Sequence, residues 1–214
     1  MILRDAKILK QEKRRRLRAI EERASPFERA RSSELICKLF QAMSSWASCR
    51  SILFFAPQSK EPDIWPLIAN ALAAKKTVAL PQFDAATKQY RAAVVKSLAD
   101  DLKKGEFGIR EPTNDCEAFP LADIDMILVP GLGFDPTGRR LGRGKGFYDR
   151  ILTPATGLIV GMAFDWQMIE AIPTERHDIP MHRIVTPSRW LACNEPPKAK
   201  RRLGAAVGKS VNAP

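Results

Sequence analysis

Apolar residues between positions 26 and 47 recur at three- and four-residue spacing, which predicts a helix with one buried face. The members of this stripe are Leu35, Ile36, Leu39, Phe40, Met43 and Trp46. The segment 25–28 (SPFE) directly before the stripe has the pattern of a capping box, with proline at the first helical position. Residues 4–24 are rich in Arg, Lys, Glu and Ala, which favours an earlier helix. The thin apolar face of that helix is formed by Leu9, Leu17 and Ile20.

Short apolar runs in the rest of the chain are typical of strands buried on both faces of a sheet. They lie at 51–56 (SILFFA), 77–80, 125–129 (DMILV), 158–164 and 184–186, and a further strand is expected at 90–95. Helices are expected at 64–74, 147–152 and 166–171, whereas 98–123 contains breakers and is predicted to be irregular. This alternation predicts an α/β fold: a single three-layer α/β/α domain over residues 1–193 with a mostly parallel sheet.

Ligands in such folds bind outside the carboxyl ends of the parallel strands. The loops that follow Ala56, Val129 and Phe164 are therefore expected to line one site.

The net charge of +11 is concentrated at the two ends of the chain. Residues 1–31 contain eleven basic and five acidic residues, residues 189–214 contain six and one, and the segment 32–188 is neutral. We expect residues 194–214, rich in Pro, Lys, Ala and Gly, to form a disordered basic tail. Polybasic ends are most often solvated, but they can also bind polyanions, so a nucleic-acid-binding function stays open as an alternative.

Two further features bound the class of protein. No apolar run approaches the roughly 20 residues of a membrane helix, so no membrane association is expected. The four cysteines form no CxxC pair, which argues against a zinc ribbon and favours a reducing, cytoplasmic location.

A glycine-rich basic loop stands out at 130–150 (PGLGFDPTGRRLGRGKGFYDR), which contains six of the twelve glycines. Gly142, Gly144 and Gly146 alternate with Arg143 and Lys145, and a predicted helix begins directly afterwards. Alternating glycines allow inward-turned amides to surround an anion, and the helix N-terminus adds a favourable dipole. The loop is neither a Walker A motif nor GxGxxG, but it predicts a phosphate site. The alternative is a flexible surface loop whose charges are solvated.

Carboxylates near this loop are candidate metal ligands. Asp149 at its mouth suggests Mg²⁺ between the carboxylate and bound phosphates, although an ion pair with Arg150 or Arg143 would also explain it. Asp178, which follows a strand and a short helix, is a possible second ligand. Glu61 is a candidate polar contact for a substrate. Asp63 is more simply explained as a helix N-cap.

The sequence also resembles a known family. Residues 129–152 (VPGLGFDPTGRRLGRGKGFYDRIL) are similar to the signature PG-x-x-FD followed by RLG-x-G-x-GYYD of the 5-formyltetrahydrofolate cyclo-ligase family. Supporting matches are the Glu61 loop, 75–81 (KKTVALP), 107–112 (FGIREP) and 172–180 (IPTERHDIP), so the resemblance covers roughly residues 7–188.

The resemblance implies an ATP- and Mg²⁺-dependent enzyme that converts 5-formyltetrahydrofolate to 5,10-methenyltetrahydrofolate and releases ADP and phosphate. It implies catalytic roles for Arg140, Arg143 and Lys145, and metal ligation by Asp149 and Asp178. The implied substrate contacts are Phe55, Glu61 and Phe147. The implied nucleotide contacts are Lys7, Lys10, Arg140, Gly142, Arg143, Gly144, Lys145, Gly146 and Tyr148.

The chain departs from the family pattern at Phe147, where a tyrosine is usual, and at Lys10, where an arginine is expected. These departures leave a second alternative, a relative that binds nucleotide or folate without closing the ring. The resemblance implies a small-molecule partner and no specific nucleic-acid partner.

Overall fold

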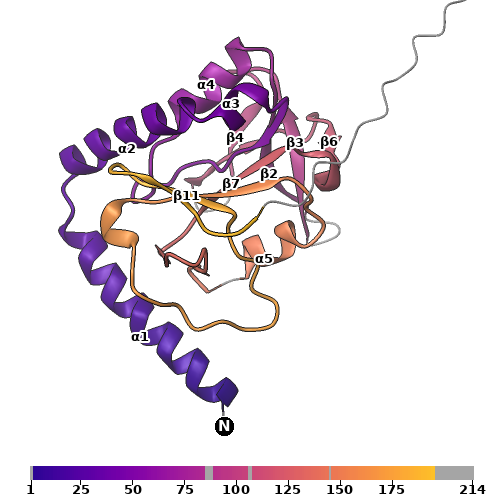
Figure 1. Cartoon of the computed structure of the whole chain (residues 1–214). Helices are drawn as coiled ribbons and strands as arrows, with labels where there is room; N and C mark the ends of the chain where they lie inside the picture. The colour runs from indigo at the N-terminus through magenta and orange to yellow at the C-terminus, as the bar shows by residue number, and fades with distance from the viewer. Residues whose placement is uncertain (1, 85–88, 106–107, 145, 196–214) are drawn as a thin grey trace, which may run out of the picture.

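The computed structural model describes residues 2–84, 89–105, 108–144 and 146–195. Its centre is an eight-stranded sheet (Figure 1). The strand order is β12 (Trp190–Ala192), β11 (Arg183–Val185), β10 (Leu158–Met162), β7 (Met126–Pro130), β1 (Ser51–Leu53), β2 (Thr77–Asp84), β3 (Gln89–Val95) and β6 (Ala118–Phe119). The strands from β11 to β2 are parallel, whereas β3 and the two edge strands β12 and β6 pair antiparallel with their neighbours. The predicted α/β class and mostly parallel sheet are confirmed.

Apolar side chains cover both faces of the sheet. On one face α2 (Pro26–Gln41), α3 (Ser44–Ser48) and α4 (Trp65–Ala73) pack over the sheet through residues such as Phe40 and Leu67. On the other face α5 (Phe147–Leu152) contributes Ile151 and Leu152, and the segment after β7 contributes Phe134. Because both faces of the sheet are covered, side chains that point to either face are buried, and the central strands therefore read as continuous apolar runs.

The first helix, α1 (Ile2–Arg23), lies apart from these layers (Figure 1). Its apolar anchor is Leu17, which is fully buried in a small cluster with Leu132, Leu141 and Ile172. Leu9, expected on the apolar face, is instead 44% exposed. Among the described side chains of α1, Leu17 is the one apolar residue that is fully buried, and Ile20 is half-buried.

The predicted capping box at the start of α2 is confirmed. The Ser25 hydroxyl accepts a hydrogen bond from the Glu28 amide at 3.1 Å, and the Ser25 amide donates to the Glu28 carboxylate at 2.8 Å. The helix ends at Gln41 rather than near residue 47, and the short α3 follows it.

Several short elements differ from the sequence-based prediction. The β2 strand continues through Pro81, which pairs with Ala92 of β3. It tolerates proline there because its pairing with β1 ends at Ala79, so no ladder bond to β1 is lost. A 3₁₀ turn, η3 (Asp165–Gln167), replaces the helix expected at 166–171.

Segments predicted to be irregular contain further small elements. They are η2 (Leu121–Asp123), the pair β4 (Leu102–Lys104) and β5 (Arg110–Pro112), and, inside the glycine-rich loop, the pair β8 (Gly133–Phe134) and β9 (Arg140–Leu141).

Asn194, which the sequence analysis assigns to the tail, donates hydrogen bonds to the carbonyls of Met181 and Thr137. Residues 196–214, the rest of the predicted tail, lie outside the described residues. Within the described part of the chain, none of the helices combines the length and apolarity that crossing a membrane requires.

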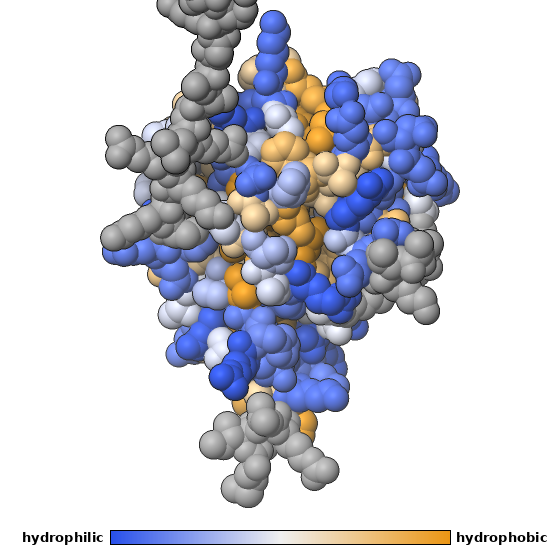
Figure 2. All heavy atoms as spheres, turned by 90° about the vertical axis from the view of Figure 1, so that its right-hand side faces the viewer, coloured by the Kyte–Doolittle hydropathy of each residue, from blue (hydrophilic) through white to orange (hydrophobic). Residues whose placement is uncertain are grey.

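Figure 2 shows that apolar side chains on one face of the molecule are gathered in its middle, between hydrophilic ones.

The histidines provide a test of the folded state against pH. His182 Nδ1 accepts a hydrogen bond from the Ile159 amide at 2.9 Å, which requires a neutral imidazole at that nitrogen. Burial, together with the nearby Arg183 guanidinium, lowers the pKa of His182 below its ordinary value of 6.5. The unfolded chain therefore takes up a proton at His182 before the folded chain does, and the free energy of unfolding falls as pH drops below 6.5.

We expect His182→Gln to flatten the pH dependence of the unfolding free energy between about pH 7 and pH 5.5. The measurement is urea denaturation at several pH values. The matched control is His177→Gln, because His177 is exposed, and this variant should keep the slope of the wild type. Equal slopes in all three proteins would contradict the role of His182.

Candidate functional site

A cavity of about 780 Å³ lies at the carboxyl ends of the parallel strands. The loop after β1 contributes Phe55, Ala56, Gln58 and Glu61 to its wall. The loop after β7 contributes Pro130, Gly131, Arg140–Gly144 and Gly146–Asp149. The segment between β10 and β11 contributes Glu175, His177 and Asp178, and α1 contributes Lys7, Lys10, Arg14 and Arg18. The predicted convergence of three loops is confirmed, and α1 forms an additional wall.

The glycine-rich loop has a backbone that favours glycine at three positions. Gly138 has φ of 86°, Gly144 has φ of 109° and Gly146 has φ of 62°, all in the range that favours glycine. Gly146 is also the residue from which α5 begins, so the left-handed conformation turns the loop into the helix. Lys145, between Gly144 and Gly146, lies outside the described residues.

Arg140 is the most enclosed cation of this loop. Only 6% of its side chain is exposed, and its Nη2 donates to Asp149 Oδ1 at 2.8 Å. Its guanidinium also lies 5.4 Å from the ring centroid of Tyr148. Its buried Nε has no hydrogen-bond partner within the described part of the chain. A buried N–H without an acceptor is costly, so this donor on the cavity wall favours an anionic ligand.

Asp149 therefore forms an ion pair, but with Arg140 rather than with Arg150 or Arg143 as the sequence alternatives proposed.

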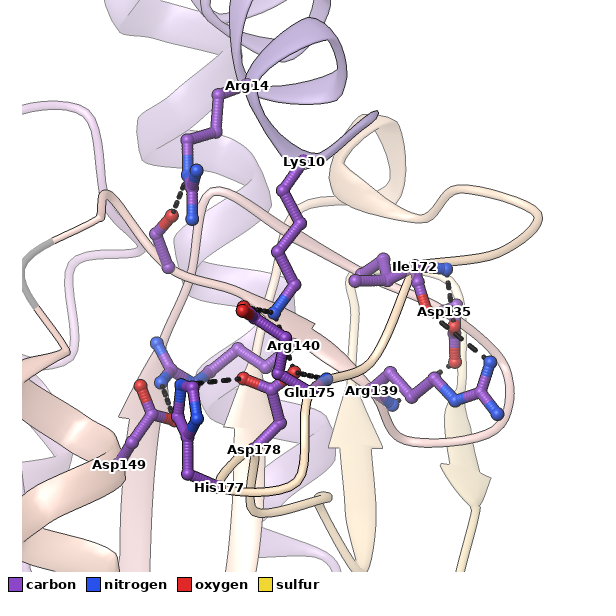
Figure 3. A network of polar contacts seen from close by, with 11 residues as sticks. Lys10, Arg14, Asp135, Arg139, Arg140, Asp149, Ile172, Glu175, His177 and Asp178 are labelled. Carbon is purple, nitrogen blue, oxygen red and sulfur yellow. Dashed lines mark hydrogen bonds and ion pairs between the residues drawn. The ribbon is translucent and has the colours of Figure 1, made fainter. Parts of the chain in front are cut away.

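Lys10 joins α1 to the segment between β10 and β11 (Figure 3). Its ammonium donates to Glu175 Oε2 and to Asp178 Oδ2, both at 2.7 Å, and only 6% of its side chain is exposed. Asp178 Oδ2 also accepts the Glu175 amide at 2.7 Å. The hydrogen bond from Lys10 lowers the pKa of Glu175. Lys10, predicted as a nucleotide contact, is thus bonded to one of the two predicted metal ligands.

The donor set on this wall is suitable for Mg²⁺. Asp149 and Asp178 line the same cavity, and each uses one carboxylate oxygen in the ion pairs with Arg140 and Lys10. Glu175, His177 and Asp178 bring ligand atoms within 4.8 Å of one another. Hard carboxylate oxygens beside a phosphate site are the ligands that Mg²⁺ prefers.

The opposite part of the cavity is aromatic. Phe147 contacts Tyr90 edge-on, with ring centroids 4.1 Å apart, and it contacts Tyr148 in the same way at 4.6 Å. Phe55 lies on the wall, although it is only 2% exposed. These rings provide an apolar surface next to the charged loop.

Glu61 is a buried carboxylate between the two parts of the cavity. It accepts the Gln58 amide at 3.1 Å, and burial raises its pKa despite that bond and the nearby Arg143. Asp63 is exposed, and its carboxylate accepts the Trp65 amide at 3.0 Å at the start of α4. Of these two acids, only Glu61 lines the cavity.

Sequence reasoning missed Arg14, Glu21, Tyr90 and Glu175. The Arg14 side chain donates to the Gly142 carbonyl at 2.9 Å and so fixes the glycine-rich loop to α1. Helical spacing from Lys7 and Lys10 places Arg14 on the same face, which is a signal that could have found it. Glu21 and Glu175 face partners more than 100 residues away, and no local pattern marks them.

Fold and site together define an α/β protein with a basic, glycine-rich loop beside an aromatic wall in one cavity. Residues 6–187 match the model of the 5-formyltetrahydrofolate cyclo-ligase family. The chain belongs to this family.

Individual relatives agree with the family match. The 5-formyltetrahydrofolate cyclo-ligase of Mycolicibacterium smegmatis is 34% identical over 161 residues, which are 71% of this chain and 83% of that protein. The cyclo-ligase of Escherichia coli K12 is 34% identical over 143 residues, covering 65% and 79% of the two chains. The solved structure of the 5,10-methenyltetrahydrofolate synthetase of Aquifex aeolicus has a TM-score of 0.79 and 31% identity, and the match covers 92% of this chain and 99% of that one.

The Lys10 contacts predict that α1 loosens when the ammonium is removed. In Lys10→Met the carboxylates of Glu175 and Asp178 lose their shared cation, and we expect the free energy of unfolding to fall by about 2 kcal/mol. Hydrogen exchange of the α1 amides should be faster in Lys10→Met than in the wild type, and exchange of the sheet amides should change less. Lys7→Met is the control, because Lys7 is an exposed lysine one turn earlier. Equal stability and exchange in the two variants would contradict the role of Lys10.

Proposed function

We propose that the chain closes 5-formyltetrahydrofolate to 5,10-methenyltetrahydrofolate with ATP, releasing ADP and phosphate. The observation that carries this proposal is Arg140, a buried guanidinium on the cavity wall whose Nε–H finds no acceptor among the described residues. Family membership gives the reaction. The buried cation supports an anionic phosphate at that point of the cavity.

In this reaction the formyl oxygen attacks the γ-phosphorus of ATP and ADP leaves. N10 then attacks the activated carbon to form the new C–N bond and loses its proton to solvent, and phosphate leaves to give the methenyl product. Phosphoryl transfer needs positioning and charge neutralisation more than covalent help from the protein. We assign charge neutralisation to Arg140, Arg143 and Lys145, with the amides of Gly142, Gly144 and Gly146 turned to the phosphates.

The remaining predicted residues take supporting roles in this proposal. Lys7 and Lys10 of α1 and Tyr148 border the nucleotide, and Phe55, Glu61 and Phe147 border the folate. A magnesium ion held by Asp149 and Asp178 would supply further charge neutralisation on the phosphates. Asp149 and Asp178 would then bind the metal in place of their present partners, and Arg140 and Lys10 would be free to contact the phosphates.

The direct test mixes the purified chain with 5-formyltetrahydrofolate, ATP and Mg²⁺ and follows the near-ultraviolet absorbance of the methenyl product. We expect product only when both ATP and Mg²⁺ are present. If ATP raises the melting temperature but no product forms, the chain is a relative that binds without closing the ring. If neither change occurs, the assignment of the cavity is wrong.

Among the cavity residues, Arg140 is the one whose substitution we expect to lower kcat most. Arg140→Ala removes the buried guanidinium, and we expect kcat to fall about a hundredfold or more. The neighbouring Arg139 is exposed and does not line the main cavity, so Arg139→Ala is the matched control and should stay within about threefold of the wild type. Steady-state kinetics in saturating ATP distinguish the two variants. Equal losses in both would show that Arg140 has no special role.

A further inference from the structure

Glu21 is a buried carboxylate near the end of α1 that no role assigned so far explains. Only 2% of its side chain is exposed, although α1 is otherwise a strongly polar helix. Its Oε1 accepts from Arg143 Nη2 at 2.9 Å. The next residue, Glu22, is exposed and pairs with Lys60. Burying a charged carboxylate is unfavourable unless it is paired, so Arg143 is the partner that makes the position of Glu21 tolerable.

Arg143 lies between two buried carboxylates. Besides the close bond to Glu21, its Nε lies 3.8 Å from Glu61 Oε1, which is too long for a hydrogen bond. The side chain of Arg143 is 35% exposed, and the residue lines the cavity. The guanidinium therefore has one edge fixed to α1 and its remaining surface available to a ligand.

The backbone around Arg143 gives this side chain little restraint of its own. It is flanked by Gly142 and Gly144, and Gly144 has a positive φ that ordinary residues rarely adopt. A long side chain on such a loop samples many rotamers unless a partner holds it. Two contacts from α1 act here together: Arg14 holds the Gly142 carbonyl, and Glu21 holds the Arg143 guanidinium.

We propose that Glu21 is a positioning residue that holds Arg143 at the cavity wall and keeps it from closing onto Glu61. The inference rests on the proposed function, in which Arg143 contacts the phosphates and Glu61 contacts the folate. Without Glu21, the Coulomb attraction of the buried Glu61 carboxylate draws the guanidinium into a full ion pair. That movement removes a cation from the phosphates and a free carboxylate from the folate at the same time.

The test uses Glu21→Gln, which keeps the shape of the side chain and removes its charge. We expect kcat to fall about tenfold or more, because a displacement of a catalytic group by about 1 Å is enough for large losses. In an Arg143→Ala background the same substitution should have no further effect on kcat or on KM for ATP. Glu21→Asp should recover part of the loss. The matched control Glu22→Gln alters the adjacent exposed carboxylate and should stay within about twofold of the wild type.

A readout that does not depend on turnover separates this inference from the proposed function. Side-chain ¹⁵N relaxation of the Arg143 Nε–H should report a rigid guanidinium in the wild type and in Glu22→Gln, and a more mobile or shifted one in Glu21→Gln. Unchanged relaxation in Glu21→Gln, or a loss of kcat that persists undiminished in the Arg143→Ala background, would overturn the positioning role. An inactive wild type whose Arg143 nevertheless responds to Glu21→Gln would overturn the proposed function alone.

Discussion

The attachment of α1 across the carboxyl ends of the parallel strands is the constraint from which the geometry of the site follows. One described apolar side chain, Leu17, is fully buried in this attachment, and several polar contacts add to it. Lys10 binds the segment between β10 and β11 and Arg14 binds the glycine-rich loop, while the exposed Glu22 adds only a weak surface ion pair with Lys60 in the loop after β1. A single helix therefore connects all three loops that a parallel sheet places at one edge. Without it, these loops would have only the strand ends to fix their relative positions.

The cavity that results is a network of paired charges. Lys10, Arg140 and Arg143 each contact at least one carboxylate; the partners of Lys10 and Arg143 belong to segments distant in sequence, whereas Asp149, the partner of Arg140, lies nine residues further along the chain. Ionised groups removed from water are stable only with such partners. A polyphosphate entering with a divalent cation would bring new partners for both signs of charge. The ligand can thus bind by replacing one charged partner with another, so that no buried charge is left without a partner. The Arg140 Nε would also gain the acceptor that it lacks among the described residues.

Much of the fold could be predicted because the decisive signals are local. The apolar runs that became β1, β7 and β10 and the capping box at Ser25 are visible within a few residues. The passage of β2 through Pro81 could not be predicted, because it depends on where the neighbouring β1 ends. The edge strand β12 was missed because it is only three residues long and its first and last residues are exposed, so it lacks the signal of a longer buried run.

The same difference between local signals and long-range contacts applies to the site. The glycine-rich loop is a local motif, and the sequence locates it correctly at the carboxyl end of a central strand. The contacts of Lys10 with Glu175 and Asp178, and of Glu21 with Arg143, join residues 122 to 168 positions apart. Only the tertiary structure brings such pairs together. For this reason the family resemblance implies a nucleotide contact for Lys10, whereas its two carboxylate partners are seen only in the structure.

Hydrogen exchange with and without an unhydrolysable ATP analogue and Mg²⁺ is the most direct measurement of the central claim, that α1 and the glycine-rich loop form one phosphate site. We expect the ligand to slow amide exchange in two places together: in α1 around Lys10 and Arg14, and in the described part of the segment from Arg140 to Leu152. Slower exchange in the loop with α1 unchanged, or no change in either, would contradict it.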